Sequence, residues 1–191
     1  MNELAKDIPR IIGPPRVEMP VLVFTDGACE ESGTTIGGVI IDGLGPVEYF
    51  GMIIPEVIVN SWRSKVGQKQ VIGQAELFPV LIARLTWRHR IAGKRVYYFI
   101  DNESARLALV KSYSPCLPSL KIVMGCLAWD QDSFSSPWYA RVPTHSNIAD
   151  APSRMTTSTE LRNMKAVCVV PKVPTEFTAS GFPELGVLRS L

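Results

Sequence analysis

Residues 20–30 read PVLVFTDGACE, and this stretch decides the fold. The proline favours an extended chain, and the apolar run after it has the composition of a buried β-strand that ends near Asp26. Residues 96–101, VYYFID, repeat the pattern and end at Asp101. Open α/β sheets bind their ligands at the carboxyl ends of the strands. We therefore expect these two carboxylates to mark the functional edge of a sheet.

Three strands are predicted in the first third of the chain. They lie at residues 20–26, 35–42 and 47–54, where apolar and β-branched residues gather. The turn sequences ESG and GLGP separate them, and short glycine-containing turns are typical of hairpins. The three strands are therefore expected to form an antiparallel meander.

A long helix is predicted at residues 71–93, after a polar connection at 55–70. Its apolar residues recur at helical spacing, and Gly93 is a typical helix end. Pro79 is awkward there, because a proline inside a helix costs about 3 kcal/mol or more. A kink, or a helix that starts close to Gln74, would accommodate it.

The second half of the chain alternates strands with helices. The predicted elements are a strand at 94–100, helices at 102–111 and 119–129, a strand at 137–142, and a final helix after the loop THSNIADAPSR. A strand between two helices implies a parallel crossover, which can place it beside the first strand. The expected fold is α/β, with a five-stranded mixed sheet flanked by helices, strands one to three antiparallel and strands four and five parallel.

One domain is expected. A chain of 191 residues can bury a core that is stable without disulfides. Residues 1–20 hold four prolines and are predicted to be an extended lead-in or linker, residues 21–159 the domain, and residues 160–191 an irregular C-terminal extension.

The composition favours an intracellular protein. Hydrophobic residues make up 46% and charged residues 20% of the chain, and no run reaches the roughly 18 apolar residues of a membrane span. The N-terminus lacks the apolar core of a secretory signal, and the four cysteines form no CxxC pair. We expect a cytoplasmic or nuclear location, with neither secretion nor membrane insertion.

Four acidic residues are candidates for one metal site. Asp26 and Asp101 end predicted strands, Glu76 lies early in the long helix, and Asp150 precedes the last helix. Placing the fourth strand beside the first would bring the two aspartates together, within reach of the other two acids. The alternative is that each acid is an ordinary surface or cap residue.

The net charge of +2 is too small to indicate nucleic-acid binding by itself. Basic residues do crowd the end of the long helix: Arg84, Arg88, His89, Arg90, Lys94 and Arg95. They fit a nucleic-acid contact and a solvated helix face equally well. Four other acids are expected to be solvated: Asp42, Glu56, Asp130 and Asp132.

Four motifs in this order resemble those of the ribonuclease H family, most closely the RNase H domain of retroelement reverse transcriptases. They are TDGAC at 25–29, AEL at 75–77, IDN at 100–102 and NIADAPSR at 147–154. The resemblance covers about residues 21–157 and implies an RNase H-like fold.

The resemblance also implies a two-metal endonuclease that cleaves the RNA strand of RNA/DNA hybrids and leaves a 3′-hydroxyl. The cofactor would be two Mg²⁺ ions, for which Mn²⁺ can substitute. Asp26 would bridge both ions, Glu76 and Asp101 would hold the ion on the leaving-group side, and Asp150 would hold the ion that carries the nucleophile.

Two departures from the family bear on substrate recognition and on proton transfer. Cellular relatives read RNA 2′-hydroxyls with an Asn six positions after the first aspartate and with polar residues before the glutamate. This chain has Ser32, Gly73 and Gln74 at those places. The family's mobile histidine usually precedes the last aspartate by a longer loop, whereas His145 lies only five residues before Asp150. His145 is a candidate for proton transfer or product release. The alternative is that it is an incidental loop histidine.

Gln74 can still donate to a sugar or phosphate, and the remaining substrate contacts must come from elsewhere. The candidates are Trp62, Arg63, Lys65 and Arg154, with Lys111 and Lys121 as further cations. Phosphate contacts by such cations would make binding dependent on salt. Trp62 has the alternative of packing its connection against the core, which is the commoner use of tryptophan.

Two other functions remain open. One is an RNase H-fold DNA nuclease of the integrase kind, and the other is a non-catalytic RNase H-like scaffold. The proline-rich lead-in fits a junction with an upstream polymerase domain and fits an independent gene equally well. The oligomeric state is left open.

Overall fold

A mixed sheet in the order β5-β4-β1-β2-β3-β6 forms the centre of the computed structural model, which describes residues 19–30, 33–66 and 71–173. Within those residues the strands are β1 (Val21–Glu30), β2 (Gly33–Ile41), β3 (Glu48–Ile53), β4 (Arg95–Ile100), β5 (Ser136–Arg141) and β6 (Val167–Cys168). Strands β1, β2 and β3 pair antiparallel, whereas β4 pairs parallel with both β1 and β5. The α/β fold class and the placing of the fourth strand beside the first are confirmed.

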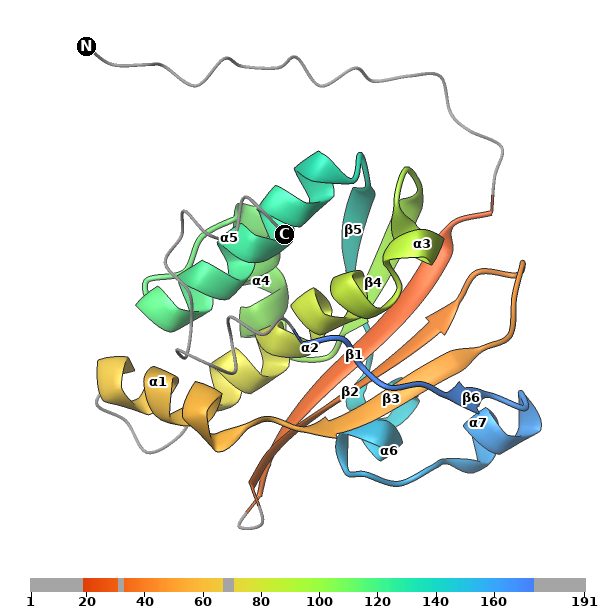
Figure 1. Cartoon of the computed structure of the whole chain (residues 1–191), viewed down its shortest axis with the longest axis horizontal. Coiled ribbons are helices and arrows are strands. Elements are labelled where there is room, and N and C mark those ends of the chain that lie inside the picture. The colour runs from red at the N-terminus through yellow and green to blue at the C-terminus, as the bar shows by residue number, and fades with distance from the viewer. Residues whose placement is uncertain (1–18, 31–32, 67–70, 174–191) are drawn as a thin grey trace.

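Helices cover both faces of this sheet. They are α1 (Glu56–Val66), α2 (Ile72–Thr86), α3 (Arg88–Ile91), α4 (Glu103–Lys111), α5 (Leu117–Asp132), α6 (Asp150–Ser153) and α7 (Thr159–Asn163), with a 3₁₀ turn at Thr144–Ser146. Figure 1 shows α2, α4 and α5 on one side of the sheet and the short helices α6 and α7 on the other. Among the described residues, no helix combines the length and the apolar character needed to cross a membrane.

The main core lies between the sheet and the large helices. Alternate residues of β1 and β4 point into it, and Val21, Val23, Val96 and Tyr98 are fully buried there. The intervening residues point to the opposite face, because side chains alternate across a strand. On that face Phe24 of β1 stacks on Phe99 of β4, with ring centroids 4.6 Å apart, and Asp26 is hydrogen-bonded to Ser153 of α6. Asp101 directly follows the last residue of β4.

The sheet has six strands, one more than predicted. Residues 160–191 were expected to be irregular, but α7 and β6 lie there. The backbone N–H groups of Val167 and Val169 donate to the carbonyls of Val47 and Tyr49 at 2.8 Å each. Pairing of this kind covers the first part of the otherwise open edge of β3.

The connection predicted at residues 55–70 is also wrong over most of its length, since α1 occupies Glu56–Val66. Ile58 and Trp62 stand one helical turn apart, and both are fully buried. The helix predicted at 71–93 is interrupted at Trp87 and forms α2 and α3.

Two buried ion pairs replace the solvated charges expected from the sequence. The guanidinium of Arg84 donates to both carboxylate oxygens of Asp130, at 3.0 and 2.8 Å, and Arg84 is fully buried. Arg90 is paired with Asp42 in the same way, at 2.8 and 2.6 Å. Burial is tolerated because two-pronged pairing satisfies both charges. Neither arginine is therefore available to nucleic acid.

Candidate metal centre

Three of the four predicted acids meet at one end of the sheet. Oxygen atoms of Asp26, Glu76 and Asp101 all lie within 4.8 Å of one another. The parallel pairing of β1 with β4, with Thr25 opposite Ile100, sets the two aspartates side by side. A group of carboxylates at this spacing can hold a hard cation such as Mg²⁺, which prefers oxygen ligands.

Gly27 explains how Glu76 reaches the two aspartates. A Cβ atom at Gly27 would overlap the backbone carbonyl of Ala75, so only glycine lets α2 come this close to β1. Pro79 contributes from inside α2, because it has no N–H to donate to that carbonyl four residues earlier. The proline that was awkward in sequence therefore lies in the helix at the place where the helix meets the strand.

The cluster is costly to ionise. Burial, followed by the charges of its acidic neighbours, raises the pKa of Glu76 from 4.5 to about 8. Burial likewise raises the pKa of Asp26 from 3.8 to about 6, while the hydrogen bond from Ser153 opposes the rise. Charged groups in such positions are stabilised by a cation or by further hydrogen bonds.

The donor atoms fit a divalent cation. Glu76 is only 7% exposed, and its Oε2 has no hydrogen-bond partner among the described residues. The same holds for Oδ1 of Asp101. Buried oxygens without partners are costly in a folded protein, and coordination to a cation would satisfy both.

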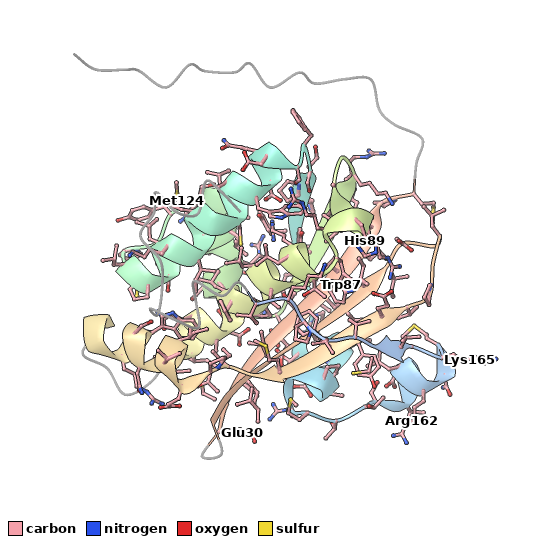
Figure 2. The ribbon with its side chains drawn as sticks, in the orientation of Figure 1. Glu30, Trp87, His89, Met124, Arg162 and Lys165 are labelled. Carbon is pink, nitrogen blue, oxygen red and sulfur yellow. The ribbon has the colours of Figure 1, made fainter. Side chains whose placement is uncertain are left out.

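Asp150, the fourth predicted acid, lines the same pocket but stands outside the closest group. Its Oδ1 accepts a hydrogen bond of 3.1 Å from Nε of Arg154. Arg154 also donates to Glu30 at 3.0 Å. Glu30 lies at the end of β1, near the tip of the hairpin (Figure 2).

The pocket is lined by five carboxylates and one guanidinium, together with Gly27, Ala28, Cys29, Ile72 and Thr144. When all six groups are ionised, the four uncompensated negative charges equal the charge of two divalent cations. The wall residues Cys29, Glu30, Ile72 and Thr144 were not singled out from the sequence, because nothing local distinguishes them.

The segment that carries Asp150 is fastened to β1 by two polar side chains. The amide of Asn147 donates to the carbonyl of Thr25 at 3.1 Å. The hydroxyl of Ser153 donates to the Asp26 carboxylate in a short hydrogen bond. Both residues belong to the NIADAPSR motif, yet sequence reasoning gave neither a role.

Asn102 was missed in the same way. Its side-chain oxygen accepts a 3.0 Å hydrogen bond from the N–H of Ala105 and so caps α4. Its side chain also forms a hydrogen bond with Glu76 that lowers the pKa of that carboxyl. One residue therefore starts a helix and orients a carboxylate of the cluster.

Several predicted substrate contacts lie elsewhere. Trp62 is fully buried and packs edge-on against Phe78, with ring centroids 5.4 Å apart, so its side chain belongs to the core. Gln74 is 5% exposed and donates to Ser119 at 2.9 Å, away from the pocket. Lys121 is buried as well, at 4% exposure.

Arg63 stays at the surface, where it pairs with Glu56 at 3.0 Å on α1. Lys65 belongs to the last turn of that helix, and its side chain lies outside the described part of the structure. His145 is exposed in the 3₁₀ turn, next to Thr144 of the pocket wall. Arg154 is the one predicted cation that lines the pocket in the described part of the chain. Ser32 lies outside the described residues.

Comparison with solved structures identifies the fold. RNase H1 from the halophilic archaeon Halobacterium salinarum NRC-1 superposes with a TM-score of 0.55 and 18% identity, over 71% of this chain and 95% of that one. The N-terminal RNase H domain of rv2228c from Mycobacterium tuberculosis was solved as a fusion with maltose-binding protein. It superposes with a TM-score of 0.51 and 17% identity, over 76% of this chain and 99% of that one.

Sequence comparison adds nothing to this likeness. No protein-family model matches the chain, and neither does any curated protein. The two structural relatives show that this chain has the RNase H-like α/β fold.

Proposed function

We propose that this protein is a divalent-metal-dependent nuclease that hydrolyses the RNA strand of RNA/DNA hybrids. The observation that carries the proposal is the buried group of Asp26, Glu76 and Asp101, with two oxygens that lack hydrogen-bond partners. Its position, at the carboxyl end of adjacent parallel strands in an RNase H-like fold, supports the same conclusion.

The mechanism assigns a holding role to each acid. Asp26 is proposed to contact both ions, Glu76 and Asp101 the ion on the leaving-group side, and Asp150 the ion on the nucleophile side. Bound cations of this kind supply an activated water and stabilise charge on the leaving oxygen. We propose Mg²⁺ as the ion, with Mn²⁺ able to replace it, and a product with a 3′-hydroxyl end.

The residues around the acids orient them and shape the pocket mouth. Asn102 and the N–H of Gly27 form hydrogen bonds with Glu76, and Arg154 holds Asp150 from the solvent side. Since Arg154 is half-exposed at the pocket, its guanidinium can also meet a substrate phosphate. His145 remains a proposal for proton transfer or product release.

A second candidate is cleavage of DNA within the same fold. The observation that favours it is the inward position of Gln74, which is bonded to Ser119 and Cys116 and cannot read a 2′-hydroxyl from there. The chemistry at the carboxylates would be unchanged, and only the substrate would differ.

Membership of a retroelement, with an upstream polymerase domain, remains part of the leading proposal of RNA/DNA hybrid cleavage.

A cleavage assay with three substrates tests the proposal. Labelled hybrid, duplex DNA and branched DNA are incubated with the protein and Mg²⁺, beside Asp26→Asn and the control Glu160→Gln. Glu160 is an exposed acid on α7, away from the pocket. We expect the hybrid to be cut by the wild type and the control but not by Asp26→Asn.

Other outcomes have definite meanings. Preferential cutting of either DNA substrate would favour the second candidate. No cutting, together with a calorimetric titration that finds no Mn²⁺ binding dependent on Asp101, would leave a non-catalytic scaffold.

A further inference from the structure

Ser153 makes an unusual contact at the centre of the site. It is the last residue of α6, it is fully buried, and its hydroxyl donates to Oδ2 of Asp26, 127 residues away in sequence. The same oxygen atom lies 2.8 Å from the backbone carbonyl of Asp150. One side chain therefore touches both acids proposed to hold the nucleophile-side ion.

The position of Ser153 is imposed by the sheet beneath it. Gly37 on β2 stands opposite Asp26, and a Cβ atom there would overlap the backbone nitrogen of Ser153. The missing side chain lets the last residues of α6 rest directly on β2. Ser153 is thus held by backbone packing and does not depend on its own hydrogen bond for its place.

The hydroxyl has one proton, so it donates to one acceptor at a time. An ionised carboxylate is a stronger acceptor than a backbone carbonyl, and the contact with Asp26 should dominate when that group is charged. The hydrogen bond at Oδ2 fixes the plane of the Asp26 carboxylate and leaves its other lone pairs for the cations.

We propose that Ser153 is a positioning residue of the metal centre, which holds the Asp26 carboxylate in one orientation toward the cations. This inference rests on the proposed function. Without the hydroxyl, the Asp26 carboxylate is free to turn, and cation binding must then supply the ordering that the hydrogen bond provides in the wild type.

Ser119 offers a matched control. It is also a buried serine, 5% exposed, and its hydroxyl accepts a 2.9 Å hydrogen bond from Gln74. It lies on α5 and lines no part of the pocket. Ser119→Ala and Ser153→Ala each remove one buried hydroxyl, but only the second removes a contact with a carboxylate of the cluster.

The experiment measures Mn²⁺ binding to chelator-treated protein, from the electron paramagnetic resonance signal of the free ion. A hydrogen bond to a charged group contributes about 1.5 kcal/mol, so Ser153→Ala is expected to weaken Mn²⁺ binding about tenfold. Ser119→Ala should bind Mn²⁺ as the wild type does. Ser153→Cys keeps the volume with a weaker donor; it should also weaken binding, and it replaces the alanine variant if that one does not fold.

Wild-type affinity in a folded Ser153→Ala or Ser153→Cys protein would overturn the inference and leave the proposed function standing. Equal weakening in Ser119→Ala would also overturn it, because the effect would then be a general loss of packing. If the wild type shows no Mn²⁺ binding that Asp26→Asn abolishes, the inference and the proposed function fall together.

Discussion

Replacing Glu76 by glutamine should stabilise the metal-free protein at alkaline pH. The pKa of this carboxyl is raised from 4.5 to about 8, mainly by burial, so the folded state binds a proton that the unfolded state has released. Its contribution to stability is therefore complete below pH 4.5 and is lost as the pH rises toward 8. At about 1.4 kcal/mol per pKa unit, the ionised carboxylate costs the folded state on the order of 4 kcal/mol at pH 8.

Urea unfolding in EDTA at pH 5.5 and pH 8 measures this cost. Glu76→Gln should lie well above the wild type in unfolding free energy at pH 8, and the gap should narrow at pH 5.5. Glu160→Gln is the control. The pKa of that exposed carboxyl is lowered, so removing its charge should not increase the free energy of unfolding at pH 8. When Mg²⁺ replaces EDTA at pH 8, the unfolding free energy of the wild type should rise, and that of Glu76→Gln should stay nearly unchanged. A wild-type stability that is flat between the two pH values would refute the reasoning.

Three further predictions follow from the same geometry. Gly27→Ala should cost roughly 1–3 kcal/mol of stability in urea unfolding and weaken Mn²⁺ binding in calorimetry, because the new Cβ overlaps the Ala75 carbonyl. Asp130→Asn should cost roughly 3–5 kcal/mol, since it leaves the charge of Arg84 buried without its partner, and a small loss in thermal unfolding would contradict this. Mn²⁺ binding at pH 7 should release protons, because Glu76 must ionise to coordinate, and calorimetric heats in two buffers of different ionisation enthalpy measure that release.

The strand-ending aspartates were predictable from the sequence because the signal is local. An apolar run that stops at an acid gives both the strand and the orientation of its end, and VLVFTD and VYYFID each became a strand of the sheet. Their adjacency followed from the parallel crossover rule, and β1 does pair with β4. The placement of Glu76 needed a third element, which the AEL motif supplied.

What the sequence could not give depends on partners far apart in the chain. Arg84 and Asp130 are 46 residues apart, and each alone has the composition of a solvated charge. The contact of Ser153 with Asp26 exists only because Gly37 seats α6 against β2. Pairwise contacts of this kind are set by packing, and no periodicity or spacing in the sequence encodes them.

Three of the four proposed ligands differ in their mechanical support. Asp26 and Glu76 are buried and bonded to neighbours on other elements, so their positions are part of the fold. Asp150 is 38% exposed at its side chain and sits on a four-residue helix, tied to Arg154 by a solvent-facing ion pair. Exposed pairs contribute at most about 1 kcal/mol and yield readily to a competing cation. The buried acids can therefore set the position of the centre, while Asp150 can exchange Arg154 for an incoming ion at little cost to stability.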